Sequence, residues 1–192
     1  MRLFAAVLPP PDVTDELAAA VARARRLPGA DGLRWTGRPG WHLTLAFYGE
    51  VGEEAVAPLA ERLARAARRT DPFELALRGG GAFGGRALWT GVTGDVPALR
   101  LLAGRAEAAA RRAGLPMEEH RRYRPHLTLA RARGRDRAVD LAPFTAALDA
   151  FAGRSWTVRE LSLVRSNLPG PGVPGEGPRY ETFAERALGT GG

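Results

Sequence analysis

Short stretches in which apolar and polar residues alternate recur along this chain of 192 residues. A period of two places every second side chain on the same face, which is typical of a strand with one buried face. We therefore expect strands near residues 2–8, 33–36, 42–47, 73–78, 86–92, 126–131, 157–165 and 180–184. The glycine-rich residues 79–85 are expected to connect two of them as a hairpin, and residues 170–177 to form a mobile surface loop.

Four longer alanine-rich stretches, of which the first three also contain several arginines, predict helices at residues 12–27, 53–69, 97–113 and 142–151. In the first, the arginines lie late, where positive charge complements the helix dipole. Pro58 is expected in or near the first turn of the second helix, because an interior proline breaks the hydrogen-bond ladder. Asp95 is a candidate cap for the third helix, and Gly114 a candidate stop.

One four-residue sequence, His-Leu-Thr-Leu, occurs twice, at residues 42–45 and 126–129. In each half of the chain it is followed by a predicted helix and another strand, with 84 positions between the two histidines. This is a weak internal duplication without a low-complexity linker. We infer an α+β fold in which residues 1–192 form a single domain of two similar lobes.

The repeated sequence combines a core face with a polar face. On an extended strand His42 and Thr44 point to one side, as do His126 and Thr128, while the leucines point into the core. If the two copies face each other, two imidazoles and two hydroxyls converge on one small group, which suits acid–base chemistry at a phosphate. Two ordinary amphipathic strands could share the sequence by chance. An identical repeat favours function in a chain with three histidines, of which His120 is expected at the surface.

The segments "WHLTLAFYGEV" and "YRPHLTLAR" resemble the paired signatures of the 2H phosphoesterases. The most similar family is the bacterial RNA 2′,3′-cyclic phosphodiesterases, also called 2′-5′ RNA ligase-like or LigT-like. The resemblance extends to "FELALRGGGAFGGRALWTGV" and "LSLVRSNL" and covers nearly the whole chain. It implies a bilobal fold in which antiparallel sheets of both lobes line a central groove and helices lie outside.

The resemblance also implies roles for the repeated residues. His42 would protonate the leaving 3′ oxygen of a cyclic phosphate, and His126 would accept the proton of the attacking water. The product would carry a 2′-phosphate. Thr44 and Thr128 would donate hydrogen bonds to the non-bridging oxygens. Either threonine could instead be a β-branched residue that suits a strand.

Residues beside the two motifs are candidates for binding substrate. Arg124 and Arg131 flank His126 and could contact phosphate, whereas Tyr123, Phe47 and Trp41 could stack on a base. The alternatives are aromatic side chains in the core and arginines in solvent. The formal charge of +7 and the pI near 11.1 favour an anionic partner such as RNA. Every basic residue is arginine, which binds phosphate bidentately but could equally reflect codon bias.

Several classes of function are disfavoured by what the sequence lacks. The chain has no cysteine, neither glycine-rich segment ends as a nucleotide P-loop, and no His-Glu-x-x-His motif is present, so we expect neither cofactor nor metal. No apolar run is long enough to span a bilayer, and prolines interrupt the N-terminal segment. We therefore expect a cytoplasmic monomer that does not bind membranes.

Other functions remain open. One is a non-catalytic module that binds nucleotides or RNA, although binding alone needs no matched acid and base. Another is a 2H enzyme that acts on a different cyclic phosphate, such as that of ADP-ribose. Formation of a 2′-5′ linkage from a cyclic end and a 5′-hydroxyl could be a side activity.

Overall fold

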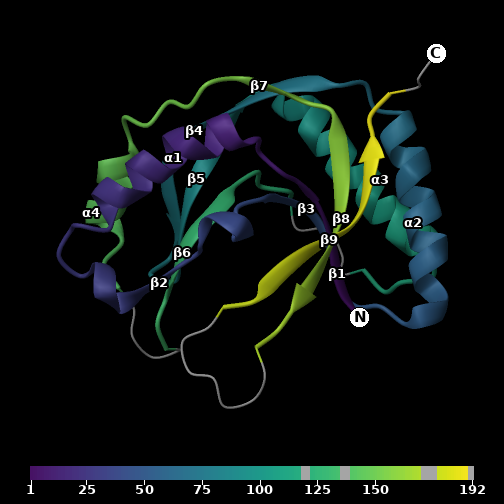
Figure 1. The fold of residues 1–192 in the computed structure, drawn as a ribbon, viewed down its shortest axis with the longest axis horizontal. Coiled ribbons are helices and arrows are strands. Elements are labelled where there is room, and N and C mark those ends of the chain that lie inside the picture. The colour runs from purple at the N-terminus through teal and green to yellow at the C-terminus, as the bar shows by residue number, and fades with distance from the viewer. Residues whose placement is uncertain (118–121, 135–138, 170–176, 190–192) are drawn as a thin grey trace.

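The computed structural model describes residues 1–117, 122–134, 139–169 and 177–189 (Figure 1). The strands are β1 Arg2–Val7, β2 Leu33–Trp35, β3 Leu43–Glu50, β4 Phe73–Phe83, β5 Ala87–Gly94, β6 Leu127–Ala132, β7 Trp156–Val158, β8 Glu160–Asn167 and β9 Arg179–Ala187. The helices are α1 Pro11–Ala24, α2 Glu53–Arg68, α3 Val96–Arg112 and α4 Ala142–Leu148, with short 3-10 turns η1 Ala30–Gly32 and η2 Arg38–Gly40. His120 lies outside the described residues.

The strands form two sheets in which neighbouring strands pair antiparallel. The first sheet has the order β3-β1-β8-β9 and the second the order β2-β6-β5-β4-β7. The first sheet draws on both ends of the chain, and the second mainly on its middle. This arrangement confirms the predicted α+β class with two antiparallel sheets. It also places the two repeated motifs in different sheets, one leading into β3 and the other into β6.

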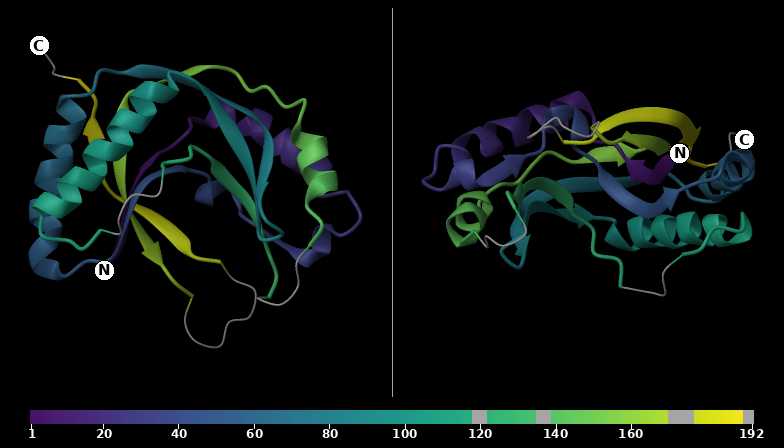
Figure 2. Two further views of the ribbon diagram at one scale, coloured as in Figure 1. Left: turned by 180° about the vertical axis from the view of Figure 1, so that it is seen from behind. Right: turned by 90° about the horizontal axis from the view of Figure 1, so that it is seen from below.

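The helices form two pairs at opposite ends of the molecule (Figure 2). Helices α2 and α3 pack together against the first sheet, and α4 packs against β4 of the second sheet with α1 beside it. Helix α3 follows a strand of the second sheet but covers the first, so the chain crosses between the lobes. Asp95 caps α3 as predicted, because its carboxylate accepts a hydrogen bond of 3.0 Å from the backbone N–H of Ala98. No helix among the described ranges is long and apolar enough to cross a membrane.

One hydrophobic core joins both sheets to the helices. The leucines of the repeated motif, Leu43, Leu45, Leu127 and Leu129, are all buried in it, as the alternation predicts. Burying one leucine side chain contributes roughly 1.5–3 kcal/mol. The opposite faces of the motifs are therefore held in place by the packing of these leucines.

The strand predicted at residues 157–165 is two strands in different sheets. Trp156 and Val158 are buried in β7, which pairs with β4, whereas Leu161 and Leu163 are buried in β8, which pairs with β1. Arg159 and Glu160 are both exposed and separate the two buried stretches, and residues 161–164 are all buried. The chain passes from one sheet to the other at this exposed pair.

The glycine-rich segment 79–85 lies in a hairpin of β4 and β5, as predicted, but most of it is strand and the connection itself is shorter than expected. β4 continues to Phe83, with a bulge between Arg78 and Gly80. Gly80 lies against Leu148, where a Cβ atom on the glycine would come within 2.6 Å of the leucine Cβ. Gly81 lies against the Trp89 ring. The glycines therefore give close packing inside the sheet as well as a turn after it.

Candidate active site

Each histidine of the repeated motif lies immediately before its strand, at the end of a constrained segment. The 3-10 turn η2 ends at Gly40, two residues before His42. Pro125 precedes His126 and favours an extended conformation for Arg124. The carbonyl of Arg124 accepts a hydrogen bond of 2.6 Å from Nδ1 of His126. With the proton on Nδ1, the lone pair of the neutral ring lies on Nε2, where it can accept a proton.

His42 is enclosed by aromatic rings from the first sheet. The ring of Phe4 on β1 lies 4.7 Å from the imidazole, and Tyr180 on β9 lies edge-on at 5.1 Å. Burial lowers the pKa of His42 to about 4, and the charges of His126 and Arg131 lower it further, while a hydrogen bond with the Gly40 backbone opposes the shift. His42 is therefore neutral at pH 7 in the unliganded protein.

His126 has a similar setting in the second sheet. Phe83 on β4 lies edge-on at 4.8 Å from the imidazole, and Trp89 on β5 lies at 6.1 Å. Burial again lowers the pKa, with a further contribution from Arg131, and the hydrogen bond with the Arg124 carbonyl opposes it. The influence of His126 on the pKa of His42 shows that the two imidazoles are near each other although they belong to different sheets.

Thr44 and Thr128 are half-buried and alternate with buried leucines, as the strand period predicts. Thr128 pairs with Trp89 across β5 and β6, and Thr44 pairs with Ala6 across β1 and β3. Within the described ranges, neither hydroxyl has a hydrogen-bond partner. Each can therefore donate to a ligand without first breaking a hydrogen bond within the protein.

Arg131 is the predicted binding residue whose charge acts on both histidines. It lowers the pKa of each, and it pairs with Arg34 across β2 and β6. Arg131, Arg34 and Arg179 line one cavity of about 350 Å³, together with Tyr180 and Gly40. A phosphate between the imidazoles would therefore have a guanidinium group beside it and further positive charge nearby.

The other predicted binding residues lie in different settings. Tyr123 packs against the core, and its hydroxyl donates a hydrogen bond of 2.9 Å to the Thr44 carbonyl. Burial raises its pKa. Phe47 is exposed, pairs with Phe4 across the sheet and has the Arg2 guanidinium 4.9 Å from its ring centroid. Arg124 is exposed and contributes its carbonyl to the histidine.

Trp41 is buried, and its indole N–H donates to the Thr36 carbonyl. Stacking on a base stays a prediction for Tyr123 and Phe47. Within the described ranges, no three His, Cys, Asp or Glu side chains form a group that could hold a metal ion.

Sequence reasoning missed the aromatic rings around the imidazoles, namely Phe4, Tyr180, Phe83 and Trp89. They come from four strands distant in sequence, so no local spacing links them to either motif. Gly81 was a usable signal, because a Cβ atom there would lie 2.2 Å from the Trp89 ring. Gly40 was another, since its Cβ would lie 3.2 Å from Tyr180. A glycine in a strand or beside a motif often marks such a close approach.

Two antiparallel sheets, each next to one His-x-Thr motif, are the arrangement expected of the two-histidine (2H) phosphoesterases. The chain belongs to the LigT-like phosphoesterase family, because the sequence model of that family, described as "LigT like Phosphoesterase", matches residues 7–93 and again residues 91–174. Each match contains one copy of the repeated motif. The internal duplication inferred from the sequence is thus also visible in the family comparison.

Relatives and solved structures agree with this assignment. An RNA 2′,3′-cyclic phosphodiesterase of Geobacillus stearothermophilus is 34% identical over 78% of this chain, and the chain spans 46% of that relative's length. One of the same name from Aeropyrum pernix is 32% identical over 86% of this chain and 94% of its own. The structure of E. coli LigT in its apo form has a TM-score of 0.74 and 26% identity, covering 98% of both chains. E. coli LigT has also been solved in complex with 3′-AMP.

Proposed function

We propose that this chain hydrolyses RNA 2′,3′-cyclic phosphate ends to 2′-phosphate ends without a metal ion. The observation that carries the proposal is the pair His42 and His126, which lead into strands of different sheets: the charge of His126 lowers the pKa of His42, and Arg131 lowers the pKa of both. The names of the relatives support a cyclic phosphate of RNA as the substrate. The complex of E. coli LigT with 3′-AMP supports a site that accepts a ribonucleotide end.

The reaction needs an acid and a base on opposite sides of phosphorus. His126 takes a proton from water through Nε2 while the water oxygen attacks phosphorus in line. The bond from phosphorus to the 3′ oxygen breaks, and His42 protonates that oxygen. Water is consumed, and the 2′ oxygen keeps the phosphate as a monoester. A linear 3′-monophosphate contains no cyclic diester bond and should not react.

The phosphate itself prepares the acid. Because His42 is neutral at pH 7 without ligand, it must gain a proton when substrate binds. The negative charge of the cyclic phosphate favours the charged imidazole and raises its pKa. Arg131 balances the charge that develops on the non-bridging oxygens, and the hydroxyls of Thr44 and Thr128 donate hydrogen bonds to them.

The deciding experiment is to incubate the purified protein with a short RNA ending in a 2′,3′-cyclic phosphate and to identify the product against 2′- and 3′-phosphate standards. We expect only the 2′-phosphate, at an unchanged rate in excess chelator. A 3′-phosphate product would reverse the assignment of the two histidines. Loss of activity in chelator that one added metal restores would require a metal-dependent mechanism, and binding without turnover at any pH would leave a binding module.

The same site could open the ring with an alcohol in place of water. A 5′-hydroxyl of a second RNA in place of water would attack the cyclic phosphate and form a phosphodiester to the 2′ oxygen. Adding such an RNA in large excess tests for this 2′-5′ ligation. An ADP-ribose cyclic phosphate offered in parallel tests the alternative substrate, and its preference over RNA by kcat/KM would overturn RNA as the substrate.

A further inference from the structure

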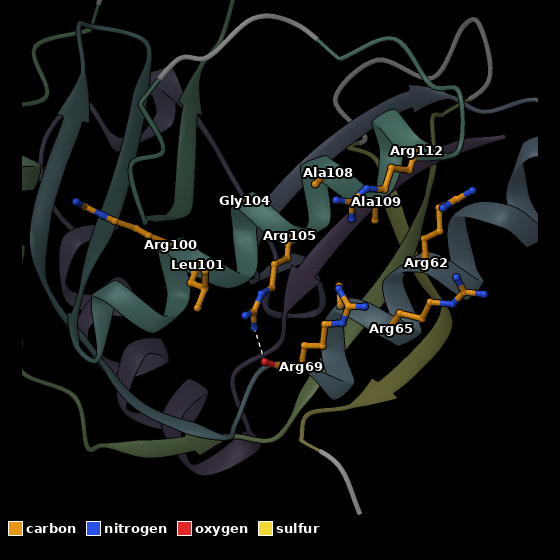
Figure 3. A pocket seen from close by; sticks show the side chains of 11 residues that line it. Arg62, Arg65, Arg69, Arg100, Leu101, Gly104, Arg105, Ala108, Ala109 and Arg112 are labelled. Carbon is orange, nitrogen blue, oxygen red and sulfur yellow. Dashed lines mark hydrogen bonds between the residues drawn. The ribbon is translucent and has the colours of Figure 1, made fainter.

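A second concave surface lies between α2 and α3, on the helical layer that covers the first sheet. Its cavity measures about 520 Å³ and is lined by six arginines, Arg62 and Arg65 from α2, Arg69 at the C-cap of that helix, and Arg100, Arg105 and Arg112 from α3. Figure 3 shows these side chains on the two helices, with Leu101 and small residues between them. None of these residues belongs to the catalytic site or its cavity. We call this surface the arginine cavity.

The charges of the arginine cavity are poorly balanced by the protein. No acidic side chain is among the residues that line it. Arg65 forms an exposed ion pair with Glu61 one turn away, and Arg105 donates to the Arg69 carbonyl and to the Thr70 hydroxyl. The Nε of Arg62 is buried, and no acceptor for it exists among the described residues. A codon bias would account for the choice of arginine over lysine, but not for the presence of six arginines around one cavity.

The spread of the arginines indicates the shape of the anion. On α3 they occupy positions 100, 105 and 112, which span about 18 Å of helix axis at 1.5 Å per residue. A single phosphate could contact only part of this row. A chain of phosphates could contact Arg105, Arg112 and the arginines opposite them together, with its bases against Leu101 and arginine planes, whereas the Arg100 side chain points away from the others (Figure 3).

The arginine cavity also has a link to the catalytic site. Arg100 is near enough to Tyr123 to influence its pKa, and the Tyr123 hydroxyl bonds to the backbone of Thr44 in the first motif. A strand whose 3′ end is held between His42 and His126 could therefore leave the site past Tyr123 and reach Arg100.

We propose that the arginine cavity is a second RNA-binding site, which holds phosphodiester groups of the strand upstream of the end being hydrolysed. The choice of RNA as the polyanion rests on the proposed function, whereas the binding of consecutive phosphates rests on the cavity alone. Occupation of the cavity adds affinity for long substrates and leaves the chemical step unchanged.

The test compares two double variants that remove the same charge from adjacent positions. R69Q/R112Q removes two arginines that line the arginine cavity, and R68Q/R111Q removes the residues just before them on the same helices, which do not line it. Fluorescence anisotropy measures binding of a labelled single-stranded 12-nucleotide RNA with a 3′-hydroxyl end. We expect the cavity variant to bind this RNA at least 5-fold more weakly than the control variant at low salt. Its slope of log Kd against log salt should fall by about 1.4, which corresponds to two phosphate contacts on a single strand.

Because that RNA has no cyclic end, the binding result is independent of catalysis. If the cyclic phosphate proves not to be the substrate, the anisotropy comparison still decides the second site. With a 12-nucleotide cyclic-phosphate substrate, we expect KM to rise in the cavity variant while kcat stays constant. A dinucleotide cyclic phosphate should be hydrolysed normally by both variants, which also shows that both are folded.

Two outcomes would overturn the second site. Equal loss of RNA affinity in both double variants would mean that only the overall charge matters. Unchanged RNA affinity together with lost binding of inorganic tripolyphosphate in R69Q/R112Q would mean that the arginine cavity takes a small free polyphosphate instead of RNA.

Discussion

At the scale of single residues, the proposed chemistry depends on two imidazoles with different tasks. Replacing His42 or His126 by alanine removes either the proton donor or the proton acceptor. We expect each change to lower kcat for cyclic-phosphate hydrolysis by at least the roughly 10²-fold typical of lost general acid–base catalysis. His120→Ala serves as the control, and we expect it to leave kcat unchanged. Near-normal turnover in either motif variant would eliminate the two-histidine mechanism.

The lowered pKa values of the two histidines give a pH dependence with a definite direction. The free enzyme reacts when one imidazole is charged and the other neutral, so kcat/KM should follow a bell in pH. Because the pKa of His42 is about 4 and that of His126 lies below 6.5, this bell should lie on the acidic side of pH 6.5. Bound phosphate raises both pKa values, so the bell for kcat should lie at higher pH.

Rate measurements from pH 4 to 9 with saturating and with dilute substrate separate the two profiles. A kcat/KM bell centred above pH 7 would contradict the environment of His42 described above. Identical profiles for kcat and kcat/KM would contradict the role assigned to the phosphate charge.

At the scale of elements, the glycine-rich end of β4 shapes the setting of His126. A Cβ atom at Gly81 would lie 2.2 Å from the Trp89 ring, so Gly81→Val must displace that ring, which faces the imidazole. We expect a loss of about 1–3 kcal/mol in the free energy of unfolding, as for other overpacked sites, together with a lower kcat. Denaturant unfolding and steady-state kinetics measure the two effects.

A double-mutant cycle shows whether Gly81 acts through Trp89. Once Trp89→Ala has removed the ring, Gly81→Val should have little further effect on kcat. Fully additive effects would mean that the glycine serves the strand by itself. Gly104→Ala is a control for stability, because a Cβ atom there meets nothing within 4 Å. It should leave the protein equally or slightly more stable, as alanine is favoured over glycine in a helix.

At the scale of the whole molecule, Tyr123 connects the segment just before the second motif with β3, the strand of the first motif. Its hydroxyl bonds to the Thr44 carbonyl on β3, which is an edge strand of its sheet. Tyr123→Phe should lower the free energy of unfolding by about 1 kcal/mol and leave the Thr44 carbonyl without this donor. We expect a lower kcat with KM unchanged, since the two motifs are then held together less firmly.

The same residue allows the stacking hypothesis to be tested. A phenylalanine keeps an aromatic ring, whereas Tyr123→Leu does not. If Tyr123 stacks on a base, KM should stay normal in the phenylalanine variant and rise in the leucine variant. If the ring serves only packing, both variants should keep KM and differ from the wild type in unfolding free energy.

The local features of this protein follow from its sequence. Alternation and helix signals located most elements, and the leucines of the repeated motif were assigned to the core because a strand period leaves no other face for them. The repeat also indicated His42, Thr44, His126 and Thr128 together, and Asp95 was found because a helix cap is a short-range interaction.

Contacts between distant segments required the tertiary structure. The pairing of strands shows that β3 and β6 lie in different sheets. The side-chain packing shows that the charge of Arg131 acts on both histidines and that four aromatic rings surround the imidazoles, namely Phe4, Tyr180, Phe83 and Trp89. The lowered pKa values have the same origin, because burial is a property of the packed molecule and not of the motif. The six arginines of α2 and α3 likewise share a cavity only because two helices from different parts of the chain pack side by side. The sequence by itself determines the residue types and the local alternation of apolar and polar positions, whereas the distances between these distant residues are decided by how the core packs.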